Sequence, residues 1–405
     1  MKFGVIMHKT TQNIGDDIQT FAAMQHLPHT DYFLDRECLD KFVTEDGKPV
    51  AVVMSAWYMW KKWNWPPSDY IVPLLVGMHY SDHQKSEQNA SPVKYQFMTG
   101  CGKEYMNAHG PVGCRDRGTA DNFKKLGINS YVSGCITLTL PKMEIRKPER
   151  EYICACDLPD KVLAKLKELT AGSGIDIIET HHYKDYRESN ATWEERERAV
   201  VELLTLYQNA KCVVTRRLHC ALPCLAMEVP VFVMNKHDAP KSGRFDPYYN
   251  WLRHCTFDEF AAGRFDYDFL DPPENSREYL KYREGITKAI ADFVEKYKDD
   301  EGSPEDHVLT DYSAEELTRW RADTMREVMN EWFGVTVQEE KQIKILKKKL
   351  KKFRSDEEYI AKLEEENKLL KKENQHLNNV MSCRSVRMAV KVRNAFAGEK
   401  KKIKL

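Results

Sequence analysis

The 405-residue sequence lacks the spacing and the long apolar runs that would indicate a zinc site, a disulfide framework or a membrane span. Its 11 cysteines are odd in number and scattered, and no two of them form a Cys-x-x-Cys pair. We therefore expect no structural zinc, no disulfide framework and a reducing compartment. The chain has no run of about 18 apolar residues, and its first residues lack the apolar core of a signal peptide, so we expect neither a membrane-spanning helix nor export.

Net charge is also absent, because 62 Lys/Arg balance 62 Asp/Glu. The balance conceals an asymmetry: residues 341–405 hold 20 Lys/Arg against 8 Asp/Glu, and the rest of the chain holds 42 against 54. A basic tail on an acidic body is typical of a tail used for interaction. The acidic body carries no recognisable nucleic-acid-binding motif, so we expect no nucleic-acid partner.

Short apolar strands alternate with amphipathic helices through the first 300 residues, which predicts a mostly parallel sheet covered on both faces. The strand-like runs include residues 50–57 and 73–80. The pattern restarts after a polar, proline-containing segment at 142–151. We therefore expect an α/β fold with two Rossmann-type domains, residues 1–145 and 146–300, that face a cleft. Ligands bind such sheets beyond the carboxyl ends of the strands.

The remainder of the chain is expected to be helical. Residues 301–335 contain an amphipathic helix at 313–334, which would close the second domain or cross back to the first. Residues 336–381 carry a short heptad seam with asparagine at one core position of each repeat, which favours a two-stranded coiled coil and a homo-oligomer. A lone solvated helix is the alternative. The seam consists of Ile360, Leu363, Asn367, Leu370, Asn374 and Leu377.

The last segment, residues 382–405, places Arg384, Arg387 and Lys391 on one helical face and apolar side chains around the other. This composition is typical of a helix that lies in an anionic membrane surface. The alternative is a solvated basic tail or a nucleic-acid patch. We expect a cytoplasmic protein attached peripherally to the inner face of the cell membrane.

The stretch "VVTRRLHCALPCLAMEVPVFVM", residues 213–234, places Arg216, Arg217 and His219 between an apolar strand and an apolar helix. Arginine matches forked anions such as phosphate and carboxylate, and the N–H groups at a helix start help to hold an anion. Histidine can give or take a proton near neutral pH. The alternative is that the arginines pair with surface acids and His219 caps the helix.

Other polar residues occupy equivalent turns. Asn13, Gly15 and Asp16 lie between the first strand and the first helix, where they would face the cleft or would simply form a turn and a helix start. Arg115, which precedes another helix, is a second anion ligand or part of a solvated turn. Arg244 is a further candidate. His181 and His182 have no Cys or carboxylate at ligand spacing, so we assign them to a strand end.

These motifs together resemble the polysaccharide pyruvyl transferase family over roughly residues 1–300. The resemblance rests on an N-x-G-D turn, on an R-D segment that precedes a helix and an L-G-I sequence, and on an Arg-Leu-His motif followed by a helix and a central proline. These correspond here to Asn13-Ile14-Gly15-Asp16, to Arg115-Asp116 with Leu126-Gly127-Ile128, and to Arg217-Leu218-His219 with Val229-Pro230-Val231. The chain departs from the family where many members have Gly-Asp-Pro and it has Gly134-Cys135-Ile136.

The resemblance implies a GT-B-like fold and transfer of the pyruvate moiety of phosphoenolpyruvate onto two hydroxyls of one sugar as a ketal. It implies that Arg217, with Leu218 beside it, binds the donor, and that Arg115, Arg216 and Arg244 assist. His219 would be the general acid/base. Asp16 would be a base or an acceptor contact, with Asn13 and Gly15 beside it. No cofactor or metal is implied, since arginines can carry the transition-state charge.

The membrane-surface tail suits a sugar acceptor on a lipid carrier, as in bacterial capsule or exopolysaccharide assembly. Two other functions fit the same sequence. One is a GT-B glycosyltransferase with a nucleotide-sugar donor, which also needs cations at a strand end of its second domain. The other is a non-catalytic scaffold dimerised by its coiled coil.

Overall fold

The computed structural model separates the chain into two units, Met1–Phe333 and Gly334–Leu405, and each is described here by itself. The domain boundaries predicted above remain predictions. The structure describes residues 1–58, 65–80, 100–143, 148–184, 191–236 and 245–303, and further on 319, 322, 326, 339–350, 360–376, 378–379, 387–388, 391 and 393.

A four-stranded parallel sheet forms the N-terminal part of the first unit, in the order β2-β1-β3-β4. A smaller parallel pair, β5-β6, lies beyond it in the sequence. The elements are β1 (Lys2–Met7), α1 (Ile14–Met24), β2 (Tyr32–Asp35), η1 (Arg36–Lys41), β3 (Val50–Val53), β4 (Ile71–Leu74), α3 (Gly100–His109), β5 (Val112–Cys114), α4 (Arg117–Lys125), β6 (Ser130–Val132) and η2 (Ile136–Thr139).

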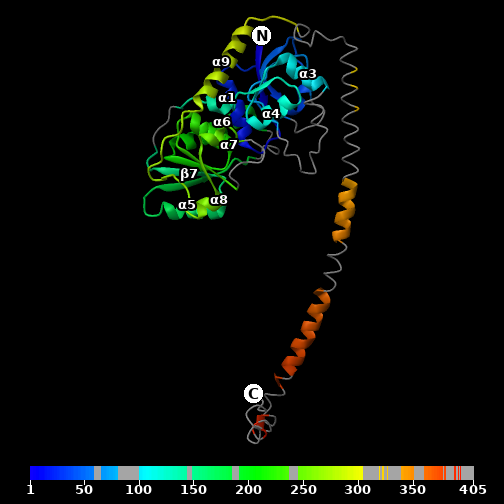
Figure 1. Ribbon diagram of the computed structural model, residues 1–405, viewed down its shortest axis with the longest axis vertical. Helices are drawn as coiled ribbons and strands as arrows, with labels where there is room; N and C mark the ends of the chain where they lie inside the picture. The colour runs from blue at the N-terminus through cyan, green and yellow to red at the C-terminus, as the bar shows by residue number, and fades with distance from the viewer. Residues whose placement is uncertain are drawn as a thin grey trace. The chain divides into compact units, whose positions relative to one another are not determined.

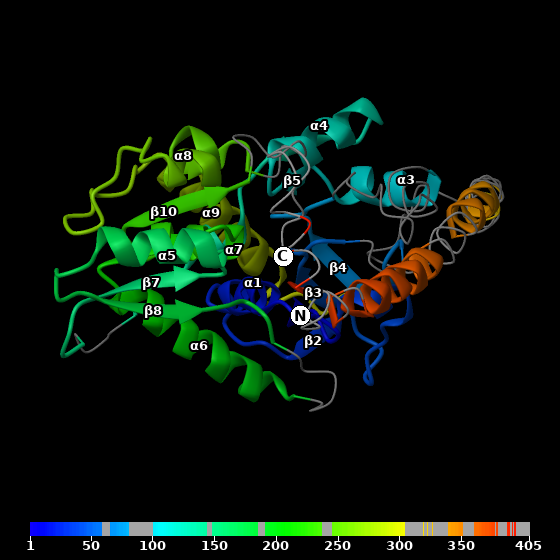
Figure 2. The same ribbon diagram turned by 90° about the horizontal axis from the view of Figure 1, so that it is seen from below.

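A five-stranded parallel sheet follows, in the order β11-β10-β9-β7-β8. Figure 2 shows α5 lying along this sheet. The elements are β7 (Tyr152–Cys156), α5 (Asp160–Leu169), β8 (Asp176–Thr180), α6 (Trp193–Asn209), β9 (Cys212–Thr215), α7 (Leu218–Ala226), β10 (Val231–Asn235), η3 (Tyr248–Asn250), β11 (Arg253–Thr256), α8 (Phe257–Ala261) and α9 (Leu280–Tyr297).

The two larger sheets share one doubly wound topology. In each, the first strand lies between the second and the third, so β1 is flanked by β2 and β3, and β7 is flanked by β8 and β9. In each sheet the second strand is therefore added on one side of the first strand, and the third strand is added on the other side. This reversal of strand order is a topological switch point, and open α/β sheets bind ligands in the crevice there. The carboxyl ends of β1, β3, β7 and β9 are thus the places to search for a site.

Successive side chains of β7 point to opposite faces of the second sheet and pack in different apolar clusters. Ile153 and Ala155 pack with Phe260 of α8 in one apolar cluster. Cys154 and Cys156 belong to a larger cluster on the other face that also contains residues of α1, α6, α7 and the first sheet. Figure 1 shows α5 and α8 on one side of this sheet and α6 and α7 on the other. One continuous core therefore joins the two sheets.

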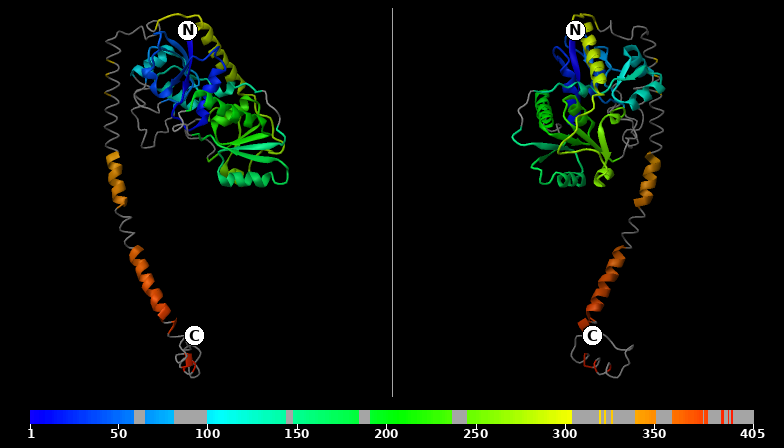
Figure 3. Two further views of the ribbon diagram at one scale, coloured as in Figure 1. Left: turned by 180° about the vertical axis from the view of Figure 1, so that it is seen from behind. Right: turned by 60° about the vertical axis from the view of Figure 1, so that its left-hand side comes forward.

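Helix α9 returns from the second sheet to the first. Its residues Ile286 and Ile290 belong to the shared core, whereas Phe293 and Tyr297 pack against Phe3 of β1. The N-terminal ammonium of the chain donates a hydrogen bond to the carbonyl of Tyr297, at 2.9 Å. Figure 3 shows α9, in yellow, running alongside the parts of the first unit that contain the two larger sheets. The helix predicted at 313–334 lies outside the described residues except for Arg319, Ala322 and Arg326, which are helical.

Most predicted elements of this unit occur near their expected positions, with one clear error. The strand expected at 73–80 ends at Leu74 as part of β4, Ile71–Leu74. Gly77 has a φ of 66° and its neighbours form no long strand. A left-handed residue interrupts the extended backbone that a strand needs.

In the second unit, residues 339–350 and 360–376 are helical, and Ile360, Leu363 and Leu370 of the predicted seam are exposed. The coiled coil remains a prediction. Nowhere in the described part of the chain is there a helix with the length and apolarity needed to cross a bilayer.

Candidate functional site

The N-terminal ends of α1 and α7 meet at Gly15. A Cβ on Gly15 would lie 2.9 Å from the Cβ of His219 and 3.1 Å from Nδ1 of His182, so no larger residue fits without displacement. Backbone hydrogen bonds fix the same contact, since the N–H of Ile14 donates to the carbonyl of His182 at 2.9 Å. The turn before α1 and the motif before α7, 200 residues apart in the sequence, therefore form one site.

Asn13 and Asp16 are largely committed to this turn. The side chain of Asn13 is the N-cap of α1, and its Oδ1 accepts a hydrogen bond from the N–H of Gly15 at 3.2 Å. Asp16 is buried and accepts from the hydroxyl of Thr11 at 2.6 Å and from the amide of Gln19 at 3.4 Å. The helix-start interpretation of Asn13 is thus what the geometry shows, and Asp16 is a carboxylate oriented by two donors.

Arg115 is buried, with 1% of its surface exposed, which excludes the solvated-turn alternative for this residue. Asp116 beside it is the N-cap of α4 and accepts from the N–H of Thr119 at 2.9 Å. The other oxygen of Asp116 accepts from Nδ1 of His79 at 2.6 Å and lies 3.7 Å from Nε of Arg115. Burial raises the pKa of Asp116, but His79 and Arg115 lower it further than burial raises it, so the carboxylate stays charged.

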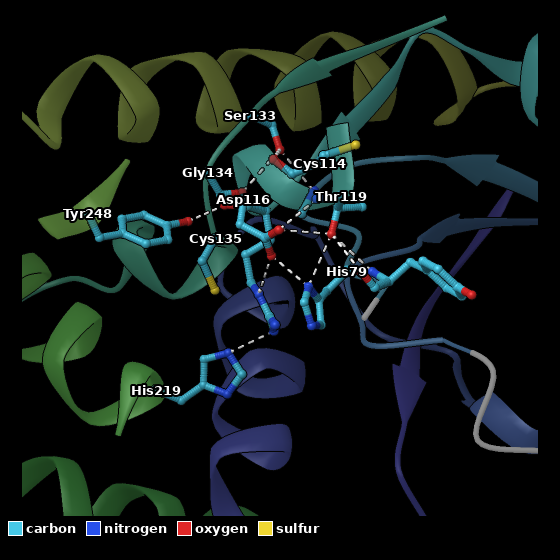
Figure 4. Close-up of polar contacts among 12 residues, drawn as sticks. His79, Cys114, Asp116, Thr119, Ser133, Gly134, Cys135, His219 and Tyr248 are labelled. Atoms are coloured by element: carbon cyan, nitrogen blue, oxygen red, sulfur yellow. Dashed lines mark hydrogen bonds and ion pairs between the residues drawn. The ribbon is translucent and has the colours of Figure 1, made fainter. Parts of the chain in front are cut away.

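The guanidinium of Arg115 reaches His219 from this anchored position. Its Nη1 lies 3.2 Å from Nε2 of His219, and both side chains are buried (Figure 4). Arginine can only donate, so Nε2 of His219 is the acceptor and the imidazole is neutral in this geometry, with its proton on Nδ1. The hydroxyl of Tyr248 donates to the carbonyl of Arg115 and holds its backbone. A buried guanidinium and a buried imidazole are thus in direct contact.

Arg217 occupies the N-cap position of α7, and 39% of its side chain is exposed. Its Nε donates to Asp157 at 2.8 Å, and the same carboxylate oxygen accepts from the N–H of His182 at 3.0 Å. Burial raises the pKa of Asp157, but these two donors lower it further. Arg217 is therefore held at the carboxyl ends of β7 and β9 with part of its guanidinium open to a ligand. Arg216 is exposed and Leu218 is buried.

Arg244 lies outside the described residues. Of the eight predicted site residues that the structure describes, His219 lies against Gly15 and contacts Arg115, Asn13 and Asp16 lie on the adjoining turn, and Arg217 is two positions before His219.

Three buried side chains of the kind that bind soft metals lie beneath this site. The ligand atoms of Cys156, His182 and Cys220 are all within 4.8 Å of one another. Tyr207 adds a hydroxyl 2.9 Å from Nε2 of His182 and 3.3 Å from Sγ of Cys156. A hydrogen bond to Cys220 raises the pKa of the Cys156 thiol, and burial raises that of Cys220. Metal binding would need both protons removed, whereas the neutral groups already satisfy one another.

Sequence reasoning missed four polar residues of this region: His8, His79, Asp157 and His182. His8 and Asp157 are each the first polar residue after a central strand, β1 and β7. That position was a usable signal, because ligands bind at strand ends. The prediction that His182 lies at a strand end is confirmed, since it follows β8, and the structure adds that Cys156 and Cys220 lie close to it in space. Its Cys partners are distant in sequence, so local spacing could not find them.

The site is that of a doubly wound α/β protein whose buried cation and imidazole lie where the ends of two parallel sheets meet. Residues 88–238 match the family model described as polysaccharide pyruvyl transferase. The match confirms the family resemblance and indicates a transferase; it includes Arg115, Arg217 and His219. No curated protein matches the chain.

The close approach at Gly15 predicts the effect of a single methyl group. Gly15→Ala should lower the free energy of unfolding by about 1–3 kcal/mol, because the new Cβ meets His219 and the α7 backbone cannot withdraw cheaply. Gly285→Ala is the matched control: it lies within α9 with no heavy atom near its added Cβ, and it should raise stability by about 0.5–1 kcal/mol. Urea denaturation of both variants measures the difference. Equal stability of Gly15→Ala and the parent would contradict the contact.

Burial lowers the pKa of His8 from its ordinary 6.5 to about 3, and nearby arginines lower it too. The unfolded chain therefore takes up this proton first as the pH falls, so the stability that the neutral ring contributes is complete above pH 6.5 and is lost toward pH 3. At about pH 5 the loss should be about 2 kcal/mol relative to neutral pH. Urea denaturation of the parent and of His8→Phe at both pH values measures it. An identical pH dependence in the two proteins would contradict the assignment.

Proposed function

We propose that this protein transfers the pyruvate moiety of phosphoenolpyruvate onto two hydroxyls of a sugar in a polysaccharide precursor, as a cyclic ketal. The observation that carries the proposal is the buried contact of Arg115 with His219, inside the segment that matches the pyruvyl transferase family. The donor carries a phosphate and a carboxylate that must be bound. In the reaction its methylene carbon gains a proton, and the two sugar hydroxyls lose theirs. A fixed cation in contact with a neutral imidazole supplies groups for both tasks.

The donor would bind between Arg115 and Arg217. A guanidinium is the side chain best matched to phosphate and carboxylate, and a buried one gains most when a desolvated anion joins it. Arg115 already has the counter-charge of Asp116 at 3.7 Å, so its burial does not leave an uncompensated cation. Arg217 adds a half-exposed guanidinium anchored by Asp157. Arg216 and Arg244 are weaker candidates to assist, and no metal is needed for the charge.

His219 would move the proton. Its Nε2 accepts a hydrogen bond from Arg115. A donor anion that draws the guanidinium toward itself would release Nε2, and its negative charge would favour protonation of the ring. The imidazolium could then protonate the methylene carbon of phosphoenolpyruvate, which makes C2 electrophilic toward a sugar hydroxyl. Asp16, held by Thr11 and Gln19, would orient the acceptor, with Asn13 and Gly15 shaping the turn.

The acceptor is proposed to be a sugar carried on a lipid, as in capsule or exopolysaccharide assembly by bacteria, with the two Rossmann-type halves arranged as in GT-B enzymes. The family match supports a polysaccharide acceptor. The basic segment at 382–405 would bind the anionic inner face of the cytoplasmic membrane, and the exposed leucines of the heptad seam would pair two chains.

Loss of the site residues should abolish turnover without unfolding the protein. Purified protein with phosphoenolpyruvate and a set of lipid-linked glycans should release phosphate and yield a pyruvylated product by mass spectrometry. His219→Gln and Arg115→Gln should each lower kcat/KM by about 100-fold or more. Arg264→Gln, an exposed arginine after α8, should change little. Stabilisation by nucleotide sugars and not by phosphoenolpyruvate would favour a glycosyltransferase, and no product with any donor would favour a scaffold.

Deletion of residues 382–405 should separate membrane binding from chemistry. The shortened chain should bind vesicles containing anionic lipid about 100-fold more weakly, because each basic residue near the surface contributes about 1 kcal/mol. Co-sedimentation with the vesicles measures this affinity. Turnover of soluble glycosides should be retained, and turnover of lipid-linked acceptors should fall. Unchanged vesicle binding together with unchanged activity on lipid-linked acceptors would refute this role of the tail.

A further inference from the structure

Two polar side chains at the first switch point have no hydrogen-bond partner within the described part of the chain. His8, which follows β1, is 1% exposed and neither of its ring nitrogens is paired. Ser55, two residues beyond β3, is 3% exposed and its hydroxyl oxygen is likewise unpaired. Buried polar atoms are nearly always paired, and each unpaired one costs about 1–3 kcal/mol. Such groups at a strand end are explained by a ligand that pairs with them.

The surroundings of His8 are charged, yet none of these charges bonds its ring. Four charged groups from different parts of the chain act on it: Arg36, Arg115, Arg196 and Asp16. Arg36 donates to Glu37 at 2.5 Å, and Arg196 donates to Asp17 and to the backbone carbonyl of His8. The carbonyl of His8 is therefore anchored while its imidazole is left for another partner. Each of these arginines has a carboxylate partner of its own, Glu37 for Arg36, Asp17 for Arg196 and Asp116 for Arg115, so the ring of His8 lies among ion pairs without bonding to them.

The location also separates these groups from the donor residues. His8 and Ser55 follow β1 and β3, the strands that flank the switch point of the first sheet. Arg217 and Asp157 follow β9 and β7, which flank the switch point of the second. Gly15 and His219 join the two regions. A two-substrate reaction fits this arrangement, with the donor at the second switch point and the acceptor at the first.

We propose that His8 contacts the acceptor sugar and takes the proton of its attacking hydroxyl, while Ser55 hydrogen-bonds the same sugar. This inference rests on the proposed function and adds the acceptor side of it. Asp16 then orients the sugar, and His8 is the base.

The protons balance in this scheme. The methylene of the donor gains one proton from His219 as the first hydroxyl oxygen bonds to C2 and gives its proton to His8. The C2–O bond to phosphate breaks, and the second hydroxyl oxygen bonds to C2 and gives its proton to the departing phosphate, which leaves as hydrogen phosphate. After product release His8 loses its proton to solvent and His219 regains one from solvent, so the first hydroxyl proton balances the one that entered the new methyl group. Burial lowers the pKa of His8 most and the nearby arginines lower it further; the bound donor would offset the arginine charges, which raises the pKa of the ring and favours proton uptake.

Steady-state kinetics test the two roles separately. The probes are p-nitrophenyl glycosides of galactose, glucose and mannose, with phosphoenolpyruvate as donor. His8→Gln keeps hydrogen bonding but cannot take a proton, so kcat should fall by about 100-fold or more and the acidic limb of the kcat profile should disappear, while the Kd for phosphoenolpyruvate stays within threefold or so. Ser55→Ala should raise the glycoside KM by about 3- to 10-fold with little change in kcat.

A second measurement covers the case in which none of these glycosides is turned over. In the full-length protein labelled with ¹³C at histidine Cε1, the signal absent from His8→Gln identifies His8. Its titration should move to higher pH when phosphoenolpyruvate binds, because the anion offsets Arg36, Arg115 and Arg196.

The outcomes distinguish the two proposals. A parent protein that neither binds phosphoenolpyruvate nor releases phosphate from it overturns the proposed function. A parent that binds phosphoenolpyruvate, beside a His8→Gln variant with unchanged kcat and pH profile, overturns only the role of His8. A His8 signal that titrates identically with and without bound phosphoenolpyruvate does the same.

Discussion

The contact between the start of α1 and the start of α7 is the constraint on which the rest of the site depends. Gly15 permits it, because any side chain there would meet His219 and His182. Both helices begin at the carboxyl end of a parallel sheet, so their close approach brings two switch points together. The shared apolar core under α1 and α7 makes this approach part of the fold and not a loose docking of two lobes.

The site also depends on the burial of Arg115, whose charge is balanced by a carboxylate that is itself held in place by other groups. Asp116 supplies the counter-charge, and capping of α4 and the contact with His79 fix its position. The Nη1 of the guanidinium donates to His219. A buried ion pair contributes little net stability, since desolvation offsets most of the attraction. Its retention here is better explained by what the guanidinium and the imidazole can do together than by stability.

The sequence predicted those parts of the fold and site that depend on local pattern. The strands β7 and β9 and the helices α5 and α6 follow directly from apolar periodicity, and Arg217 and His219 were found because they lie where such a strand gives way to a helix. The pattern could not separate Arg216, which is exposed, from Arg217, because the direction of a side chain after a strand end depends on the turn.

Tertiary contacts account for what the sequence did not reveal. Arg115 pairs with His219 across 104 positions, and Arg217 pairs with Asp157 across 60. Helix α9 was missed as the element that returns to the first sheet, because its role is set by Phe293 and Tyr297 meeting Phe3, at the far end of the sequence. No local spacing encodes these distances.

The polar residues of the site fall into two groups, those whose side chains have hydrogen-bond partners in the described part of the chain and those whose buried side-chain atoms have none. The Oδ1 of Asn13 caps α1, and one carboxylate oxygen of Asp157 accepts from both Arg217 and the N–H of His182, so these two residues organise the site. His8 and Ser55 belong to no motif, yet their unpaired buried atoms represent a free-energy cost that the folded chain by itself does not recover. Folding alone would favour replacing them with apolar residues of similar size. Under the proposal above, the acceptor sugar supplies the hydrogen-bond partners that the described part of the chain does not give to His8 and Ser55.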